Sequence, residues 1–158
     1  MVNNSPLVSV LITCFNSEKF IEETIKSVLN QTFKDFEIVI VDDASTDSSI
    51  KIIQSFDDAR IRLIRNNENL KISKARNIGI RESKGHYIAI LDSDDLSHKR
   101  RLELQVNFLN ANSEIGILGS RYQCFGASSG RVRKYTNNEH LKAYLLFGSC
   151  FGHSTVMF

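Results

Sequence analysis

Residues 87–96 read YIAILDSDDL, an apolar, strand-forming run that ends in three aspartates: Asp92, Asp94 and Asp95. Carboxylates this close raise one another's pKa and cost stability unless a cation or a proton offsets them. Asp92 and Asp94 are two residues apart, so in an extended chain they point to the same side and can share one ion. The stretch therefore predicts a buried strand that ends either in a cation site or in a polar turn. In the second case Asp95 or Ser97 would cap the next helix.

Further strands and helices are predicted on both sides of this stretch. The candidate strands are apolar and rich in β-branched residues, and they span Val8–Thr13, Phe36–Val41, Ile61–Ile64 and Tyr87–Leu91. Amphipathic helices are predicted from the cap Ser17 to Leu29, from about Thr46 to Phe56, from about Ser73 to Lys84 with Gly85 as the C′ residue, and from about Ser97 to Leu109. This alternation predicts an α/β fold with a mainly parallel sheet flanked by helices.

The pattern is weaker after Asn112. Short strands are predicted at Ile115–Gly119 and Tyr122–Phe125, and a helix at Asn138–Phe147. The chain stops at Phe158 inside an apolar stretch without a terminating cap, so we expect a domain truncated at its C-terminus. We predict one domain over residues 1–158, with a βα core over 1–112 and an incomplete region over 113–158.

Composition and charge narrow the class of protein. A chain of 158 residues with 42% hydrophobic and 24% charged residues is typical of one soluble globular domain. The net charge of +2 does not favour a nucleic-acid partner. The basic run Lys99-Arg100-Arg101 and a looser one, Arg131, Arg133 and Lys134, are interpreted as solvated faces. Contact with phosphates or with anionic lipid head groups is the alternative.

The compartment is predicted from three absences. No apolar run approaches the ~20 residues that span a bilayer, and the N-terminus lacks the layout of a signal peptide. The three cysteines, Cys14, Cys124 and Cys150, follow no metal-ligand or redox spacing. Free thiols in a reducing cytoplasm are therefore expected, with peripheral membrane association left open.

Polar residues follow three of the predicted strands, at 13–16, 42–43 and 92–95. Ligands bind outside the carboxyl ends of strands in open parallel sheets, so these clusters are expected to meet at one edge. A dinucleotide site is excluded because the turn after the first strand reads TCFN rather than G-x-G-x-x-G. A phosphotransferase of the haloacid dehalogenase type remains an alternative for Asp92-Ser93-Asp94, although that family carries its D-x-D on the first strand. A nucleotide-sugar site is the third candidate, because a diphosphate leaving group needs a bridging cation such as Mg²⁺ or Mn²⁺.

Five blocks of sequence occur in an order that points to a known family. They are VSVLITCFN at 8–16, QTF at 31–33 with DFEIVIVDDASTD at 35–47, ARNIG at 75–79, KGHY at 84–87 leading into the D-x-D, and HSTVMF at 153–158. With these blocks the chain resembles the N-terminal, nucleotide-binding half of a family 2 glycosyltransferase with the GT-A fold. The resemblance covers nearly the whole chain.

The resemblance implies an activity and its partners. The donor would be a UDP-sugar bound with Mg²⁺ or Mn²⁺. The sugar would pass by direct, inverting transfer to a hydroxyl of a carbohydrate or lipid-linked saccharide, without any role for nucleic acid. The setting would be surface-polysaccharide or glycolipid synthesis on the cytoplasmic side of a membrane.

The resemblance also assigns roles to residues of the strand ends. Thr13 and Phe15 would line the uridine pocket. Asp43 would accept a hydrogen bond from the base, with a helix-capping turn beside Asp42 and Ser45 as the alternative. Asp92 would touch the ribose or stand near the metal. Asp94 would be the main metal ligand, and Asp95 would support the metal site or cap a helix.

Arg76, His153 and Lys71 are further candidates. Arg76 would lie near the nucleotide or pair with a carboxylate of the site; an ordinary first-turn helix position is the alternative. His153 would be a polar group on the acceptor side or a structural histidine. Lys71 departs from the family, which has a small residue there, often Gly. The resemblance places the general base beyond residue 158, so residues 1–158 would bind donor but transfer poorly, or act as a binding module without catalysis.

Overall fold

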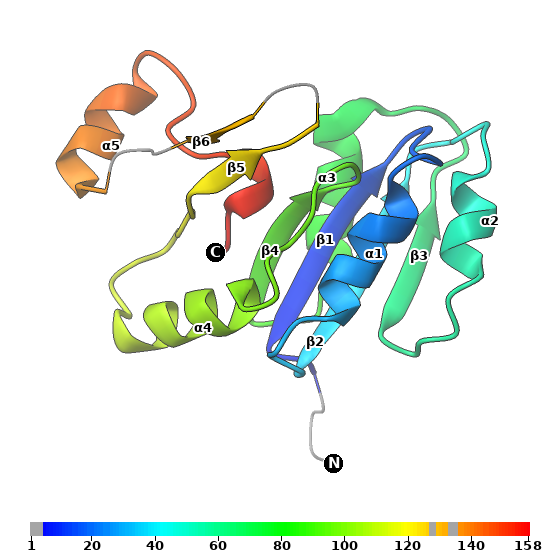
Figure 1. Ribbon diagram of the computed structural model, residues 1–158, viewed down its shortest axis with the longest axis horizontal. Coiled ribbons are helices and arrows are strands. Elements are labelled where there is room, and N and C mark those ends of the chain that lie inside the picture. The colour runs from blue at the N-terminus through cyan, green and yellow to red at the C-terminus, as the bar shows by residue number, and fades with distance from the viewer. Residues whose placement is uncertain (1–4, 127–128, 133–135) are drawn as a thin grey trace.

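A four-stranded parallel sheet forms the centre of the protein. The computed structural model describes residues 5–126, 129–132 and 136–158 (Figure 1). The strands lie in the order β3-β2-β1-β4. They span Val8–Cys14 (β1), Phe36–Asp42 (β2), Ile61–Arg65 (β3) and Tyr87–Asp92 (β4). The predicted α/β class and the four predicted strands are confirmed, and each strand runs one residue further than expected.

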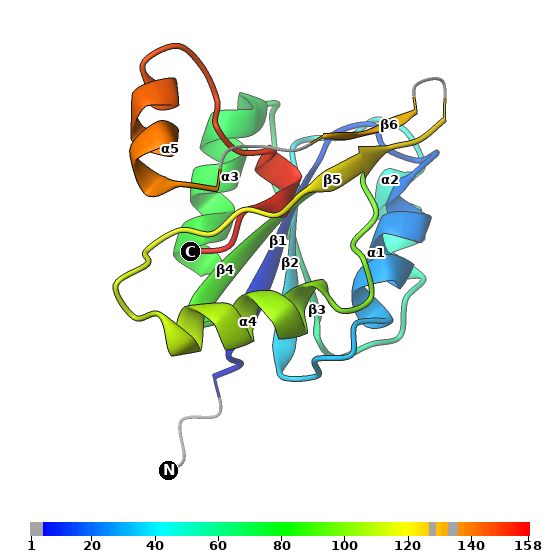
Figure 2. The same cartoon turned by 60° about the vertical axis from the view of Figure 1, so that its left-hand side comes forward.

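Helices cover both faces of the sheet, as Figures 1 and 2 show. Three of them, α1 (Ile21–Leu29), α2 (Ser49–Gln54) and α4 (Arg101–Ala111), pack on one face with the alternate β1 residues Val10 and Ile12. The helix α3 (Lys71–Glu82) packs on the other face, where Ala75 meets Leu11 and Val39. Central strands covered on both sides read as continuous apolar runs, and this is why the sequence predicted them well.

The starts of α1 and α4 differ from the prediction because their caps come from other residues. The helix α1 begins at Ile21, and no side chain caps it; the hydroxyl of Ser17 lies against that of Ser93 instead. The helix α4 begins at Arg101 rather than near Ser97, and neither Asp95 nor Ser97 caps it. The buried Gln31 does so, because its Oε1 accepts from the Leu102 N–H at 3.1 Å.

The sequence predicted Gly85 as the C′ residue of a helix, and this prediction is wrong. The helix α3 ends at Glu82, and Gly85 sits where the chain passes β1. A Cβ atom at Gly85 would lie 2.4 Å from the Ser9 nitrogen and 2.7 Å from the Val8 carbonyl carbon. Glycine is required at this position for close approach of two backbone segments.

The residues after α4 form smaller elements beside the sheet. A hairpin pairs β5 (Tyr122–Cys124) with β6 (Gly130–Val132), a strand that the sequence did not predict. Of the strand expected at Ile115–Gly119, only Leu118 forms a bridge, to Met157. The helix α5 (Asn138–Leu145) ends earlier than predicted and lies away from the sheet (Figures 1 and 2).

The last residues of the chain return to the sheet. They follow a short 3₁₀ helix, η1 (His153–Thr155), and run antiparallel to β4. The Ile88 N–H donates to the Phe158 carbonyl at 2.7 Å, and the Ile90 N–H donates to that of Val156 at 2.9 Å. Residues 153–158 are thereby placed beside the aspartate turn that follows β4.

The basic run 99–101 was interpreted as a solvated face, but Arg101 does not lie on one. It is 7% exposed, and burial lowers the pKa of its guanidinium to about 10. Arg133 and Lys134 of the second basic run lie outside the described residues. The cysteines Cys14, Cys124 and Cys150 are free. In the parts of the chain that the structure describes, every helix falls short of the length and apolar character of a membrane span.

Candidate functional site

Three strand ends meet at one edge of the sheet. In the register of the parallel ladders Cys14 lies opposite Asp42, and Thr13 lies opposite Asp92. The polar residues that follow β1, β2 and β4 are therefore neighbours, as the sequence predicted. This edge is where open α/β sheets bind ligands.

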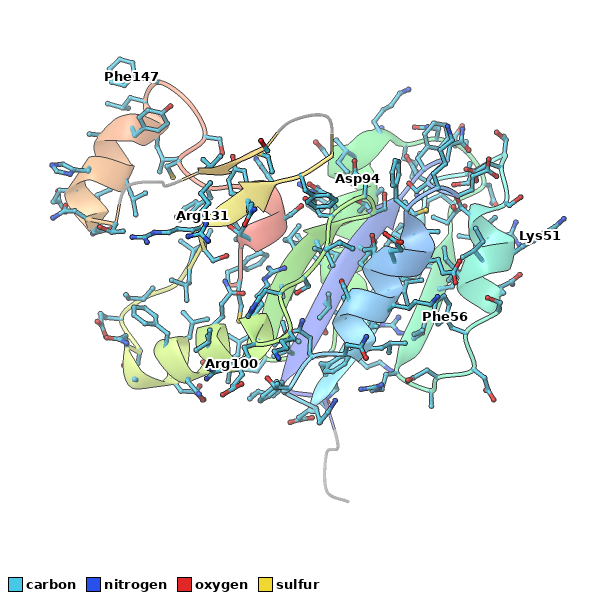
Figure 3. All side chains as sticks on the ribbon, in the orientation of Figure 1. Lys51, Phe56, Asp94, Arg100, Arg131 and Phe147 are labelled. Atoms are coloured by element: carbon cyan, nitrogen blue, oxygen red, sulfur yellow. The ribbon has the colours of Figure 1, made fainter. Side chains whose placement is uncertain are left out.

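The turn after β4 presents Asp94 to solvent. The Asp95 N–H donates to the Asp92 carbonyl at 3.2 Å and closes the turn. At its centre, Ser93 is held twice: its hydroxyl lies 2.7 Å from that of Ser17, and its carbonyl accepts from the Thr24 hydroxyl at 3.0 Å. Asp94 is exposed and is labelled in Figure 3. Ser17, in the loop before α1, and Thr24, in α1, hold this carboxylate-bearing turn through Ser93; the sequence reading assigned none of the three to the site.

Arg76 pairs with the first aspartate of this turn. Its Nη2 donates to Asp92 Oδ1 at 2.9 Å, and its Nη1 lies 3.4 Å from His153 Nδ1. A guanidinium only donates, so Nδ1 is the acceptor in this contact. The Asp92 N–H donates to the Ser154 hydroxyl at 3.1 Å. Of the readings left open for Arg76, pairing with a carboxylate of the site is the one that the structure shows.

The carboxylates of the turn fit a cation that also takes ligands from its substrate. Among the residues described, no three His, Cys, Asp or Glu side chains come together as a metal cage. Asp92 forms an ion pair with Arg76, so Asp94 and Asp95 are the carboxylates of the turn that could bind a cation. One or two carboxylates completed by phosphate oxygens and water are the usual ligand set of protein-bound Mg²⁺. The turn thus suits a cation bound together with a diphosphate.

Asp43 caps α3 directly, although it follows β2 and is distant from α3 in the sequence. It is 4% exposed, and its carboxylate accepts from the Leu70 N–H at 3.0 Å and from the Lys71 N–H at 2.8 Å. The Asn66 side chain donates a third hydrogen bond at 2.7 Å. A separate turn joins the Ser45 N–H to Asp42 Oδ2. The capping reading of Asp43 is therefore realised, but on α3 rather than on the turn beside Asp42 and Ser45.

Lys71 has a left-handed backbone, with φ of 71°. This conformation costs roughly 1–2 kcal/mol for a residue with a Cβ. It turns the Lys71 N–H toward Asp43 at the start of α3. The conformation explains why a glycine is suited to this position.

Thr13 and Phe15 differ in exposure. Thr13 is 8% exposed, whereas Phe15 is 48% exposed and presents a ring to solvent at the sheet edge. The loop after β1 is tied to the loop after β2 because the Thr46 N–H donates to Asn16 Oδ1 at 2.8 Å and the Asn16 N–H to Ser45 Oγ at 2.9 Å. An exposed aromatic ring beside buried polar residues is suited to packing against a planar base.

A cavity of about 790 Å³ opens beside the aspartate turn. Its lining includes Asp92, Asp95 and Arg101, the β5–β6 hairpin, and η1, whose Ser154 accepts from the Asp92 N–H. His153 belongs to this lining. The arginines of the hairpin, Arg121 and Arg131, were not predicted as site residues, because short exposed strands carry no periodic signal.

An α/β sheet that gathers an exposed aromatic, a buried aspartate and a D-x-D turn at its carboxyl edge, next to an open cavity, is the arrangement of a GT-A fold. The family described as "Glycosyl transferase family 2" matches residues 9–157. The chain belongs to this family.

Relatives and solved structures agree with this assignment. The chain is 31% identical to Glycosyltransferase GlyG of Streptococcus pneumoniae serotype 4 over 85% of its length and 45% of that protein. It is 42% identical to the Escherichia coli "UDP-Glc:alpha-D-GlcNAc-diphosphoundecaprenol beta-1,3-glucosyltransferase WfaP" over 65% of its length and 41% of that protein. The chain thus spans about half the length of the curated relatives it matches; for three others the share is 57%, 38% and 62%.

Two solved structures share the fold at 25% and 26% sequence identity. The first is S. aureus TarS 1-349 in complex with UDP-GlcNAc, with a TM-score of 0.75 over 82% of this chain and 38% of that one. The second is the mannosyltransferase PcManGT from Pyrobaculum calidifontis in complex with GDP-Man and Mn²⁺, with 0.67 over 73% of this chain and 35% of that one.

Proposed function

We propose that the chain is the donor-binding part of a metal-dependent, inverting glycosyltransferase that transfers a hexose from a UDP-sugar to an acceptor hydroxyl. The observation that carries this proposal is the turn after β4. Asp94 and Asp95 are left for a cation while Arg76 holds Asp92, at the same sheet edge as the exposed ring of Phe15.

Each residue of the edge receives a role in this proposal. Phe15 packs against the uracil, and Thr13 lines the inner end of the uridine pocket. Asp43 positions the start of α3; a carboxylate has about four lone-pair sites, so the three bonds it accepts leave one for the base. Asp92 stands at the ribose, and Asp94, supported by Asp95, holds Mg²⁺ or Mn²⁺.

The cation would stabilise the negative charge that develops on the diphosphate as the glycosidic bond breaks. The chain's own residues orient the donor: Arg76 keeps Asp92 off the cation, and Ser17 keeps the turn in place. We assign deprotonation of the acceptor to a carboxylate beyond residue 158, and we take residues 113–158 as the start of the acceptor side of a single domain.

The relatives support the choice of donor and acceptor. TarS is solved with UDP-GlcNAc, and PcManGT with a nucleotide sugar and Mn²⁺. The name of WfaP includes UDP-glucose and a diphosphoundecaprenol-linked sugar. We therefore propose a carbohydrate or lipid-linked saccharide as acceptor, in polysaccharide or glycolipid synthesis at the cytoplasmic face of a membrane. A phosphotransferase is disfavoured because the D-x-D follows the fourth strand in a family 2 chain.

Calorimetric titration of the protein with UDP, GDP and ADP, each with and without Mn²⁺, tests the donor part of the proposal. We expect UDP to bind most tightly and to need the metal. Equal binding of the three nucleotides, or none, would contradict it. Transfer from UDP-sugars to saccharide acceptors, assayed on the longest available chain with the anomer of the product read by NMR, separates an inverting enzyme from a binding module without catalysis.

A further inference from the structure

The β5–β6 hairpin presents two arginines on one face. Side chains alternate along an extended chain, so Arg121, directly before β5, and Gln123 share a face. Gln123 lies opposite Arg131 in the antiparallel ladder, and residues paired in this way point to the same side. All three line the cavity beside the aspartate turn. The cavity therefore has a wall with two guanidinium groups.

Neither arginine has a carboxylate partner within the described residues. The arginines that form ion pairs within the described residues are others: Arg60, Arg62, Arg76 and Arg100. A guanidinium offers five N–H donors in a fork that matches phosphate, and Arg121 and Arg131 keep theirs for a ligand.

The charge of the cavity lining is positive. Arg101 adds a third guanidinium, buried and bonded to the carbonyls of Ile90 and Val156 at 3.0 and 3.2 Å. The carboxylates of the lining are Asp92 and Asp95, and Asp92 is already paired with Arg76. Three guanidiniums thus face one carboxylate without an ion pair, and such a cavity favours an anion.

The hairpin arginines share the cavity with Asp95 but not with Asp94, the main proposed ligand of the cation. Asp94 is absent from the cavity lining, and Figure 3 shows Arg131 and Asp94 well apart. Phe125 follows Arg121 and Gln123 in the same alternation, is 62% exposed and also lines the cavity. An aromatic ring beside guanidiniums is suited to a sugar that carries a phosphate.

We propose that Arg121 and Arg131 form a subsite for a phosphate group on the acceptor, so that the acceptor is a phosphate-bearing saccharide. The assignment to the acceptor rests on the proposed function, whereas the anion subsite itself does not. The arginines would hold the phosphate by charge-assisted, bidentate hydrogen bonds, and Phe125 would pack against the sugar.

Calorimetric titration of the protein with glucose 1-phosphate and with glucose, at low salt, tests this subsite. The variant is R121Q/R131Q, and the control is R81Q/K84Q, which removes two exposed charges at the end of α3 and beyond it. We expect glucose 1-phosphate to bind about tenfold or more weakly to R121Q/R131Q and to be little affected in the control. UDP binding with Mn²⁺ should not change in either variant.

Three results would overturn the subsite: equal losses in the two double variants, equal binding of glucose and glucose 1-phosphate, or no binding of glucose 1-phosphate. A loss of UDP affinity in R121Q/R131Q as large as that in Asp94→Asn would assign the arginines to the donor diphosphate and overturn the assignment to the acceptor. If glucose 1-phosphate binding depends on the arginines while UDP fails to bind with Mn²⁺, the anion subsite is supported and the proposed function fails.

Discussion

The hydroxyl of Ser17 lies 2.7 Å from the hydroxyl of Ser93, which is 76 residues further along the chain. This hydrogen bond joins the loop after β1, where Phe15 is exposed, to the centre of the aspartate turn. The two halves of the proposed donor site therefore depend on each other's position.

Replacing Ser93 by alanine tests this connection. We expect Ser93→Ala to lower the free energy of unfolding by about 1 kcal/mol, the usual net value of one hydrogen bond. UDP affinity in the presence of Mn²⁺ should fall several-fold, because Ser93 loses its hydrogen bond to Ser17 and keeps only the one from Thr24. The control is Ser55→Ala, which also removes one hydroxyl hydrogen bond but lies at the end of α2. Equal UDP affinity in the two variants, measured by calorimetry, would contradict the connection.

The pair Arg76–Asp92 offers a second test. In Arg76→Gln, Asp92 loses its cationic partner. Its negative charge then adds to those of Asp94 and Asp95 and repels the diphosphate of UDP. We expect UDP affinity at fixed Mn²⁺ to fall about tenfold. The pair is partly exposed, so the free energy of unfolding should change by no more than about 1 kcal/mol.

Arg62→Gln is the matched control for Arg76→Gln. Arg62 is also partly exposed and ion-paired, with Glu37 and Glu82, and like Arg76 it has a buried Nε without a hydrogen-bond partner. It lies away from the aspartate turn. A loss of UDP affinity in Arg62→Gln as large as in Arg76→Gln would show that the effect is not specific to the site.

Lys71 predicts a gain in stability. Lys71→Gly relieves a left-handed backbone at the start of α3, against the entropy cost that glycine carries. We expect the free energy of unfolding in urea to rise by about 0.5–1 kcal/mol. Lys74→Gly, at an exposed position inside the same helix, should lower it by about 1 kcal/mol. The same sign for both variants would contradict the role of the Lys71 conformation.

Asp58 predicts a dependence of stability on pH. The hydrogen bond from Arg60 lowers the pKa of the Asp58 carboxyl from 3.8 to about 2 in the folded protein. A carboxyl with a lowered pKa stabilises the fold fully above its unfolded pKa and loses this effect as the pH falls through the folded one. The stability difference between the wild type and Asp58→Asn should therefore be constant above about pH 4 and shrink between pH 4 and pH 2. Urea unfolding at a series of pH values measures it, and a constant difference would count against this ion pair.

The strands could be predicted from the sequence because their signal is local. Val8–Cys14 and Phe36–Asp42 are covered on both faces by helices, so nearly every residue is apolar and the run itself marks the strand. The order of strands and helices then places the three polar clusters at one edge.

The helix starts and the cavity could not be predicted because their partners are distant in sequence. Gln31 caps α4 and Asp43 caps α3, and no pattern near either helix reveals this. Arg101 looks like part of a solvated basic run, yet it is buried against the carbonyls of Ile90 and Val156. The second strand of the hairpin, Gly130–Val132, is three residues long and has no alternation to detect.

In the proposed donor site, Asp94 holds a divalent cation together with the diphosphate of UDP. The most direct measurement is an EPR titration of free Mn²⁺ with the protein, in the presence and absence of UDP. It should compare the wild type with Asp94→Asn and with the control Asp57→Asn, an exposed aspartate before β3. We predict weak Mn²⁺ binding without UDP, tight binding with UDP, and loss of the tight binding in Asp94→Asn alone. Tight Mn²⁺ binding that UDP does not change, or that survives in Asp94→Asn, would contradict the claim.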